Sequence, residues 1–245
     1  MDYKVKRVLI TGAAQGIGLS IAESLAKENI SVIISDINEE AAIKSAMFLE
    51  KQFGCPTIGV KMDVADKQSV TRTVSQLTKK YGVIDGLVNN AGICNSARPL
   101  DEITEDEWKR VFTINVLGMV HCINAVIEGM RKQGYGKIVN MTSSSGFTGG
   151  ISVSASYSVS KAGVMALTKN AANQFGPNGI TVNAVSPGII ETEMTENLSY
   201  DKSGLALRRF GDKKEVSSLV AFLLSQGSDY MTGNIVDVNG GLYMR

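Results

Sequence analysis

The sequence is poor in the residues that metal sites and disulfide scaffolds need. Its 245 residues include one histidine, His121, and three scattered cysteines, Cys55, Cys94 and Cys122, without a Cys-x-x-Cys pair. A His-based metal site or a Ser–His–Asp triad would depend on His121 alone. We therefore expect no metal, no disulfide framework, and reduced thiols in a cytoplasmic protein.

Runs of one charge and long apolar runs are also missing. The 25 Lys and Arg residues nearly balance the 24 Asp and Glu residues, and the formal net charge is +1. This balance argues against a nucleic-acid partner or a membrane surface. Met1–Lys6 is polar, so we expect no signal peptide, and no apolar stretch is expected to reach the length of a membrane span.

What the sequence does contain is an alternation of strand and helix patterns. Short apolar runs predict buried strands at 8–10, 32–34, 58–62, 84–89, 138–141, 180–185 and 235–238. Apolar residues at helical spacing predict helices at 16–29, 39–53, 67–81, 104–129, 156–175 and 213–224. Alternation of this kind is typical of a parallel sheet covered on both faces. We predict an α/β, single-domain, doubly wound Rossmann fold over 1–245 with a seven-stranded parallel sheet.

One long segment fits neither pattern. Residues 192–211 are rich in polar side chains and follow the sixth predicted strand. Long irregular segments in compact domains are often active-site lids. We predict a mobile substrate lid here.

The turn after the first strand is rich in glycine and reads Thr11-Gly12-Ala13-Ala14-Gln15-Gly16-Ile17-Gly18. Glycine lets the backbone approach a pyrophosphate, and the following helix offers free N–H groups and a positive dipole end. The alternative is a turn that is merely flexible. We favour a dinucleotide site whose first members are Gly12, Gln15, Gly16, Ile17 and Gly18.

Two acidic residues end the second and third predicted strands. A carboxylate at Asp36 would accept hydrogen bonds from the adenosine ribose hydroxyls and repel a 2′-phosphate. Gln15, Ile37 and Asn38 include no cation that would attract that phosphate, so the cofactor is predicted to be NAD(H). Asp63 would meet the adenine amino group. The alternatives are a helix-capping Asp36 and a turn-forming Asp63.

Tyr157 and Lys161 are four residues apart and would share one face of a helix. A free phenol has a pKa of about 10 and is a poor base near pH 7. A cation about 4 Å away contributes roughly 4 kcal/mol at an effective dielectric constant near 20. That is enough to lower the phenol pKa by about 2–3 units. The pair therefore predicts acid–base catalysis, although a helix can carry such a pair by chance.

These features occur in a familiar order with several others. The further motifs are Asp63-Val64, Asn89-Asn90-Ala91-Gly92, Asn115, Ser143 and Pro187-Gly188-Ile189-Ile190-Glu191-Thr192. The chain resembles the short-chain dehydrogenase/reductase family over essentially its whole length. The resemblance implies that Asn90–Gly92 lie beside the adenine ribose and that Ile190 and Thr192 hold the nicotinamide carboxamide. The cofactor set then also includes Ile37, Val64, Asn90, Ala91, Gly92, Tyr157, Lys161, Ile190 and Thr192.

The resemblance also implies a catalytic set of Asn115, Ser143, Tyr157 and Lys161. Ser143 would donate a hydrogen bond to the developing alkoxide, and its neighbour Ser144 is the alternative. Asn115 resembles the residue that holds a water feeding protons to Lys161. It could also be an ordinary amide inside a helix.

The expected reaction is hydride transfer between NAD(H) and a carbonyl or secondary alcohol. Asp36 favours NAD(H), whereas carrier-protein reductases usually take NADPH. The resemblance also places Gly134 and Asn178 at positions where those reductases have arginine. Both departures favour a sugar, polyol, hydroxysteroid or small hydroxyketone as the substrate. The alternative is a 3-oxoacyl-thioester reductase acting on acyl-carrier-protein or CoA substrates. The carboxyl end of the chain resembles that subfamily at residues 207–211, 220–224 and 239–241. A different class of alternative is a catalytically silent NAD-sensing protein.

The resemblance further implies a homotetramer. It would be built through the two long helices, where Met119, Val126 and Met165 are candidates to face outward. Apolar positions of this kind more often belong to the core.

Overall fold

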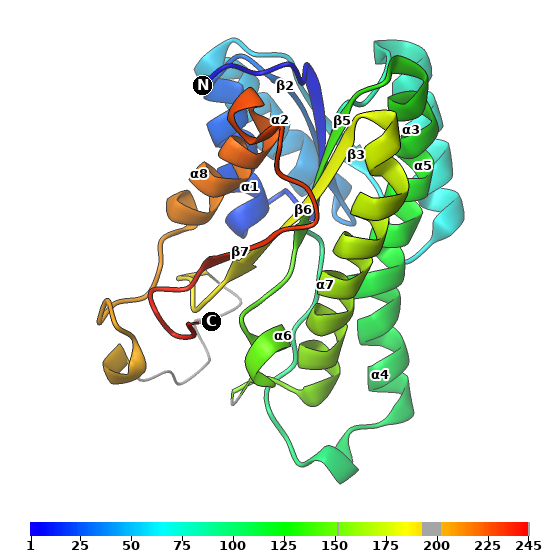
Figure 1. Cartoon of the computed structure of the whole chain (residues 1–245). Coiled ribbons are helices and arrows are strands. Elements are labelled where there is room, and N and C mark those ends of the chain that lie inside the picture. Colours follow the sequence, from blue (N-terminus) through cyan, green and yellow to red (C-terminus); the bar gives the residue numbers. More distant parts are fainter. Residues whose placement is uncertain (151, 193–201, 245) are drawn as a thin grey trace.

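The computed structural model describes residues 1–150, 152–192 and 202–244 and contains one central sheet (Figure 1). The seven strands are all parallel and lie in the order β3-β2-β1-β4-β5-β6-β7. This order reverses between β1 and β4, which creates a crevice at the carboxyl ends of those strands. The predicted doubly wound Rossmann fold and its seven-stranded parallel sheet are confirmed. The strands are β1 (Arg7–Thr11), β2 (Ser31–Asp36), β3 (Thr57–Lys61), β4 (Gly86–Asn89), β5 (Gly136–Met141), β6 (Ile180–Pro187) and β7 (Ile235–Val238).

Helices cover both faces of the sheet (Figure 1). One face carries α1 (Gly16–Lys27), α2 (Glu39–Phe53) and α8 (Lys213–Leu224). The other carries α3 (Lys67–Tyr81), α5 (Gly118–Gln133) and α7 (Ala155–Phe175). Successive side chains of a strand point to opposite faces, so Val8 and Ile10 join the first layer and Leu9 joins the second. A strand buried on both sides must be apolar throughout, which is why the strand signal was clear.

The predicted helix over 104–129 is a continuous run with an irregular middle. It consists of α4 (Glu105–Phe112), a π-helical turn η2 (Thr113–Leu117) and α5, and it ends at Gly134 in the left-handed conformation. The run Glu105–Gln133 is long and apolar enough to cross a membrane, by length and composition only. The expectation that no apolar stretch reaches this length was therefore wrong. Its apolar side, including Cys122, Val126 and Met130, packs on the sheet as in a core helix.

The structure differs from the sequence-based expectations at α6 (Ser145–Thr148) and at three apolar helix positions. The short helix α6 was missed because a single turn is too short to show a period. Met119, Val126 and Met165 do not face outward: all three are buried in the chain's own core. The predicted lid, 192–211, falls partly on residues 193–201, which lie outside the described residues. Beside them the structure describes the turn η4 (Lys202–Gly204) and a bridge between Ile190 and Gly211.

Candidate active site

The glycine-rich turn lies at the carboxyl end of β1 and leads directly into α1. Gly12 has φ of +59°, and a Cβ there would come within 2.8 Å of Ala91 Cα. Gly16 has φ of +61° and faces open space, with no atom within 4 Å of a built Cβ. Gln15 precedes α1 and makes no side-chain capping bond, whereas Asn38, Asp66, Thr104 and Asp212 cap α2, α3, α4 and α8. The turn therefore offers space and free N–H groups to an anion.

Asn90 joins this turn to the end of β4. Its side-chain nitrogen donates to Thr11 O at 2.9 Å and to Gly12 O at 2.8 Å. In return, Thr11 Oγ1 accepts from the backbone N–H groups of Asn90 and Ala91, both at 3.0 Å. A Cβ at Gly18 would meet Asn90 Nδ2 at 2.6 Å, so glycine is required there as well. Asn90 thus holds the two strand ends on either side of the crevice together.

Asp36 reaches across from the end of β2 to the same turn. Its Oδ2 accepts from Ala14 N at 3.2 Å, and its Oδ1 accepts from Asn38 N at 3.1 Å. The carboxylate is half-buried, and Ile37 beside it is exposed. These contacts leave lone pairs on both oxygens for further donors. Asp36 is therefore placed to accept from a ligand held by the glycine turn.

Asp63 and Val64 follow β3. Asp63 Oδ1 accepts from Ala65 N at 2.9 Å, which is the local turn contact considered as the alternative to an adenine contact. The other carboxylate oxygen of Asp63 could still accept a hydrogen bond from the adenine amino group. Val64 is buried, and its carbonyl lies 2.9 Å from His121 Nδ1, so the lone histidine acts as a tie between α5 and this loop.

Tyr157 and Lys161 occupy the first turns of α7. Lys161 Nζ lies 5.6 Å from the centroid of the Tyr157 ring and donates to Met141 O at 2.9 Å. The lysine is only 4 % exposed, while Tyr157 is half-buried. Burial lowers the pKa of Lys161 to about 8, partly opposed by the nearby Cys94. Burial raises the Cys94 pKa to about 11, so near pH 8 that thiol is neutral and burial governs the lysine.

One hydrogen bond ties these turns of α7 to the end of β5, and a second lies within the helix. Thr142 Oγ1 donates to Lys161 O at 2.7 Å, and Ser160 Oγ donates to Tyr157 O at 2.6 Å. Neither residue was in the predicted set. Their signal in the sequence is weak, because Ser and Thr are common at strand ends and helix starts.

Asn115 lies in the π-helical turn and is fully buried. Its Oδ1 accepts from Ile93 N at 2.9 Å, and its Nδ2 donates to Ile93 O and Ser160 Oγ, both at 3.0 Å. A Cβ at Gly92 would lie 3.2 Å from Asn115 Oδ1 and 3.5 Å from Lys161 Nζ. Gly92, Asn115 and Lys161 therefore meet, although the Asn115 side chain is occupied by protein partners.

The three serines after β5 differ in exposure. Ser143 is half-buried, whereas Ser144 and Ser145 are buried. Ser143 Oγ accepts from Ser145 N at 3.2 Å and from Ser145 Oγ at 3.0 Å. Its own proton remains available for a donor role. This geometry favours Ser143 over Ser144 as the hydroxyl that a ligand can reach.

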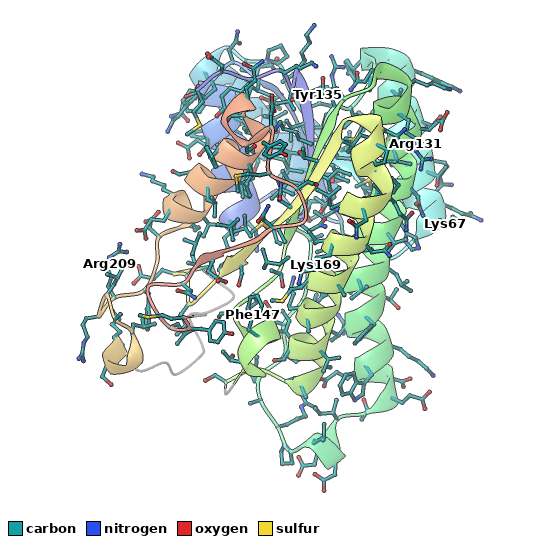
Figure 2. All side chains as sticks on the ribbon, in the orientation of Figure 1. Lys67, Arg131, Tyr135, Phe147, Lys169 and Arg209 are labelled. Atoms are coloured by element: carbon teal, nitrogen blue, oxygen red, sulfur yellow. The ribbon has the colours of Figure 1, made fainter. Side chains whose placement is uncertain are left out.

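The far end of the site is formed by the segment after β6 and by the carboxyl terminus. Ile190 is buried, and the segment pairs with Gly211 through Glu191 N to Gly211 O at 3.0 Å. Thr192 is half-buried at the edge of the described residues. Phe147 points from α6 toward the carboxyl-terminal segment (Figure 2) and stacks on Tyr243 with centroids 5.4 Å apart.

A groove elsewhere can be set apart from this site. It measures about 830 Å³ and lies between α3 and α5, where Lys67, His121 and Lys132 are among its lining residues. None of the predicted catalytic residues lines it. Within the described ranges, no group of three His, Cys, Asp or Glu side chains has metal-site geometry, and Cys55, Cys94 and Cys122 are free thiols.

Comparison with known proteins places these features in context. A family model described as enoyl-(acyl carrier protein) reductase matches residues 12–243. The 3-oxoacyl-(acyl-carrier-protein) reductase of Staphylococcus epidermidis is 38 % identical over 244 residues, covering 98 % of this chain and 99 % of that protein. A Brucella melitensis 3-oxoacyl-(acyl-carrier protein) reductase with bound NAD superposes with a TM-score of 0.91 at 34 % identity, covering 98 % of this chain and 92 % of that one. A blue fluorescent protein from a metagenomic library, in complex with NADPH, reaches 0.91 at 30 % identity, with 98 % of both chains covered.

Proposed function

The chain belongs to the short-chain dehydrogenase/reductase family, and on that premise we propose that it reduces 3-oxoacyl thioesters with NADH. The observation that carries the proposal is the 38 % identity to a 3-oxoacyl-(acyl-carrier-protein) reductase across 98 % of the chain. The relatives favour the thioester alternative over the sugars, polyols, hydroxysteroids and small hydroxyketones that the sequence first suggested. The oxidoreductase class itself follows from the family.

A nicotinamide dinucleotide fits the carboxyl edge of the sheet. Open space at Gly16 and the uncapped start of α1 suit the pyrophosphate, and Asp36 suits the adenosine ribose. Relatives bind either NAD or NADPH, so they do not decide between the two. The half-buried Asp36 carboxylate and its apolar neighbour Ile37 support NAD(H), because a 2′-phosphate would meet a negative charge there.

Three of the four predicted catalytic residues have a direct task in the reaction. When bound, the nicotinamide ring supplies the hydride in the reductive direction. Tyr157 donates its hydroxyl proton to the substrate carbonyl oxygen as charge develops there. Ser143 donates a hydrogen bond to the same oxygen. The buried Lys161 ammonium, 5.6 Å from the Tyr157 ring centroid, favours the phenolate that remains.

Recognition of the group that carries the thioester would take place at the corner of the molecule where α5 and α7 end. The two positions at which the resemblance implies arginine in carrier-protein reductases lie there: Gly134 ends α5, and Asn178 lies in the turn η3 (Gly176–Asn178). Arg131, one turn before Gly134, is exposed and lies 5.2 Å over the Phe175 ring. One arginine therefore remains at this corner, which supports a partner with negative charge, such as a phosphorylated carrier group.

The test is a comparison of substrates with the purified enzyme. We expect acetoacetyl-CoA and acetoacetyl-acyl carrier protein to be reduced faster than any sugar, polyol or hydroxysteroid ketone, and faster with NADH than with NADPH. The ratio of the two thioester rates identifies the preferred carrier. Tyr157→Phe serves as the control, since it should bind NADH without turnover.

Two results would contradict the proposal. Turnover of a sugar or polyol, with inert thioesters, would support the first expectation from the sequence. Tight NADH binding with no turnover of any carbonyl would support the NAD-sensing alternative.

A further inference from the structure

Glu107 is an acidic residue of α4 whose side chain points inward. Its side chain is 8 % exposed, although Glu105 in the same helical turn is 81 % exposed. Glu107 Oε1 accepts two short hydrogen bonds, from Ser154 Oγ at 2.6 Å and from Ser156 Oγ at 2.8 Å. Both serines are fully buried and lie within three residues of Tyr157. The Glu107 carboxylate of α4 therefore binds the two serines that lie just before Tyr157.

Ser154 is used differently from an ordinary helix cap. It precedes α7 as the N-cap residue, yet its side chain makes no capping bond to its own helix. Its hydroxyl donates to Glu107 instead and lies 3.0 Å from Ser156 Oγ. The first turn of α7 is therefore oriented by Glu107, whose negative charge also suits the positive end of that helix. Tyr157 N donates to Ser154 O at 3.1 Å, so the tyrosine belongs to the same turn.

The second oxygen of Glu107 faces the segment that follows β4. Arg98 Nη1 lies 3.4 Å from Glu107 Oε2. This segment is joined to the start of α7 by a bridge between Ser96 and Val153 and by Ser154 N donating to Asn95 O at 2.9 Å. The hydrogen bonds from Ser154 and Ser156, and one from Asn95, lower the pKa of Glu107. Glu107 is thus an anion at neutral pH, held between the first turn of α7 and the segment that follows β4.

We propose that Glu107 is a positioning residue, which sets the place of Tyr157 by holding the first turn of α7 and the Asn95–Arg98 segment in register. The inference rests on the proposed reductase function. Glu107 does not line the cofactor turn, so its effect is expected on turnover and not on cofactor binding. Hydrogen bonding to Ser154 and Ser156, more than charge, carries the effect, because those two contacts are the shortest.

The experiment compares Glu107→Ala, Glu107→Gln and the control Glu105→Gln in the full-length enzyme. Glu105 is exposed and pairs with Lys109 at 2.7 Å, so its variant should behave like the wild type. Glu107→Ala is expected to lower kcat by about 10- to 100-fold, the loss typical of a misplaced catalytic group, with the NADH dissociation constant unchanged. Glu107→Gln keeps an acceptor for both hydroxyls and should retain most of the wild-type kcat.

A readout without substrate accompanies the kinetics. In the cofactor-free enzyme, backbone amides of 155–161 should exchange hydrogen faster in Glu107→Ala than in the wild type, while amides of α1 should not change. In a Ser154→Ala/Ser156→Ala background, adding Glu107→Ala should cost little more turnover, because the shared contacts are already gone.

The possible failures are distinguishable. If the wild type reduces no carbonyl, the proposed function fails, and the exchange data still test Glu107. If Glu107→Ala keeps the wild-type kcat and loses only thermal stability, Glu107 stabilises the fold without positioning Tyr157, and the inference is overturned. If Glu107→Gln is as slow as Glu107→Ala, positioning by hydrogen bonds is overturned.

Discussion

At the scale of single residues, the chemistry of this site depends on burial and on neighbouring donors. Lys161 is an ammonium group surrounded by protein, and Asp36 is a carboxylate that already accepts two backbone N–H groups. Ser143 is the accessible member of a serine run whose other members are buried. Each of the three supports a prediction.

Replacing Asp36 should change the choice of cofactor. Asp36→Ala removes the negative charge that a 2′-phosphate would meet, so affinity for NADPH should rise and affinity for NADH should fall. Fluorescence titration with both cofactors measures the ratio of the dissociation constants. The exposed Asp2→Ala is a suitable control. An unchanged ratio would mean that the discrimination lies outside Asp36.

The two candidate serines can be separated by paired variants. Ser143→Ala should lower kcat by roughly 10²–10³-fold, the usual cost of losing one donor to a developing oxyanion. Ser144→Ala should have a much smaller effect on kcat, because Ser144 is buried. Steady-state kinetics of both variants decide the matter, and the reverse order of effects would assign the role to Ser144.

Lys161 should make stability depend on pH in a specific window. Its folded pKa, about 8, is below the ordinary 10.5, because burial disfavours the charge. Between these values the unfolded chain binds more protons, so this residue's contribution to stability rises with pH. Below pH 8 the burial penalty is present in full, at about 3 kcal/mol.

We therefore expect Lys161→Met to be more stable than the wild type at pH 7. The difference in unfolding free energy should narrow as the pH rises from 8 toward 10. Urea unfolding of both proteins at several pH values measures it. A difference that does not change with pH would contradict the buried, titrating lysine.

At the scale of secondary-structure elements, α7 is joined by hydrogen bonds to three separate parts of the fold. Thr142 ties it to β5, Asn115 to the π-helical turn, and Glu107 to α4. Asn115 lies in the π-helical turn, and its amide contacts Ile93 and Ser160. In a regular α-helix the Asn115 side chain would point in a different direction. The helix that carries Tyr157 and Lys161 is therefore held by three other parts of the fold.

A second tie joins β5 to the turn η5 (Gln226–Ser228) after α8. Lys137 is almost fully buried, and its Nζ lies 2.8 Å from Asp229 Oδ1 and 3.1 Å from Ser228 Oγ. Asp229→Asn leaves a buried ammonium without its partner charge and should destabilise the fold by about 1–3 kcal/mol. Lys137→Met removes the charge at similar volume and should be better tolerated.

Urea unfolding of the two variants provides the test. Lys132→Met, which breaks an exposed 3.5 Å pair with Glu128, is the matched control and should cost less than about 1 kcal/mol. If Lys137→Met proves more destabilising than Asp229→Asn, the ammonium is supported by more than its ion pair.

At the scale of the whole molecule, the two halves of the sheet meet at the crevice between β1 and β4. The first half contributes the glycine turn and Asp36, and the second contributes Ser143, Tyr157 and Lys161. Neither half contains both the predicted cofactor turn and the predicted catalytic pair. The predicted site therefore requires the complete sheet.

The homotetramer expected from the family can be tested on the outer faces of the long helices. Leu117 and Val159 are apolar and 48 % and 47 % exposed, unlike the buried positions first considered. Leu117→Asp combined with Val159→Asp should shift sedimentation toward smaller species if these helices form the contact. Met47→Asp, on the exposed face of α2, is the control. A wild-type monomer, or an unaffected tetramer, would contradict the expected assembly.

Much of the fold was determined by the sequence itself. Strands buried on both faces must be apolar and short, and helices on a sheet must repeat their apolar residues, so α2, α3, α8 and β7 were predicted to the residue. The glycine turn could be recognised in the sequence because its backbone conformation and close packing allow few other residues. Local chemistry of this kind is written in neighbouring positions.

Only the tertiary structure decided how distant residues meet. Glu107 carries no sequence signal, yet the packing of α4 against α7 places its carboxylate on Ser154 and Ser156. The difference in exposure between Ser143 and Ser144, the inward direction of Met119 and the pKa of Lys161 likewise depend on burial. Burial is set by contacts between elements far apart in the chain, and no local pattern of residues encodes those contacts.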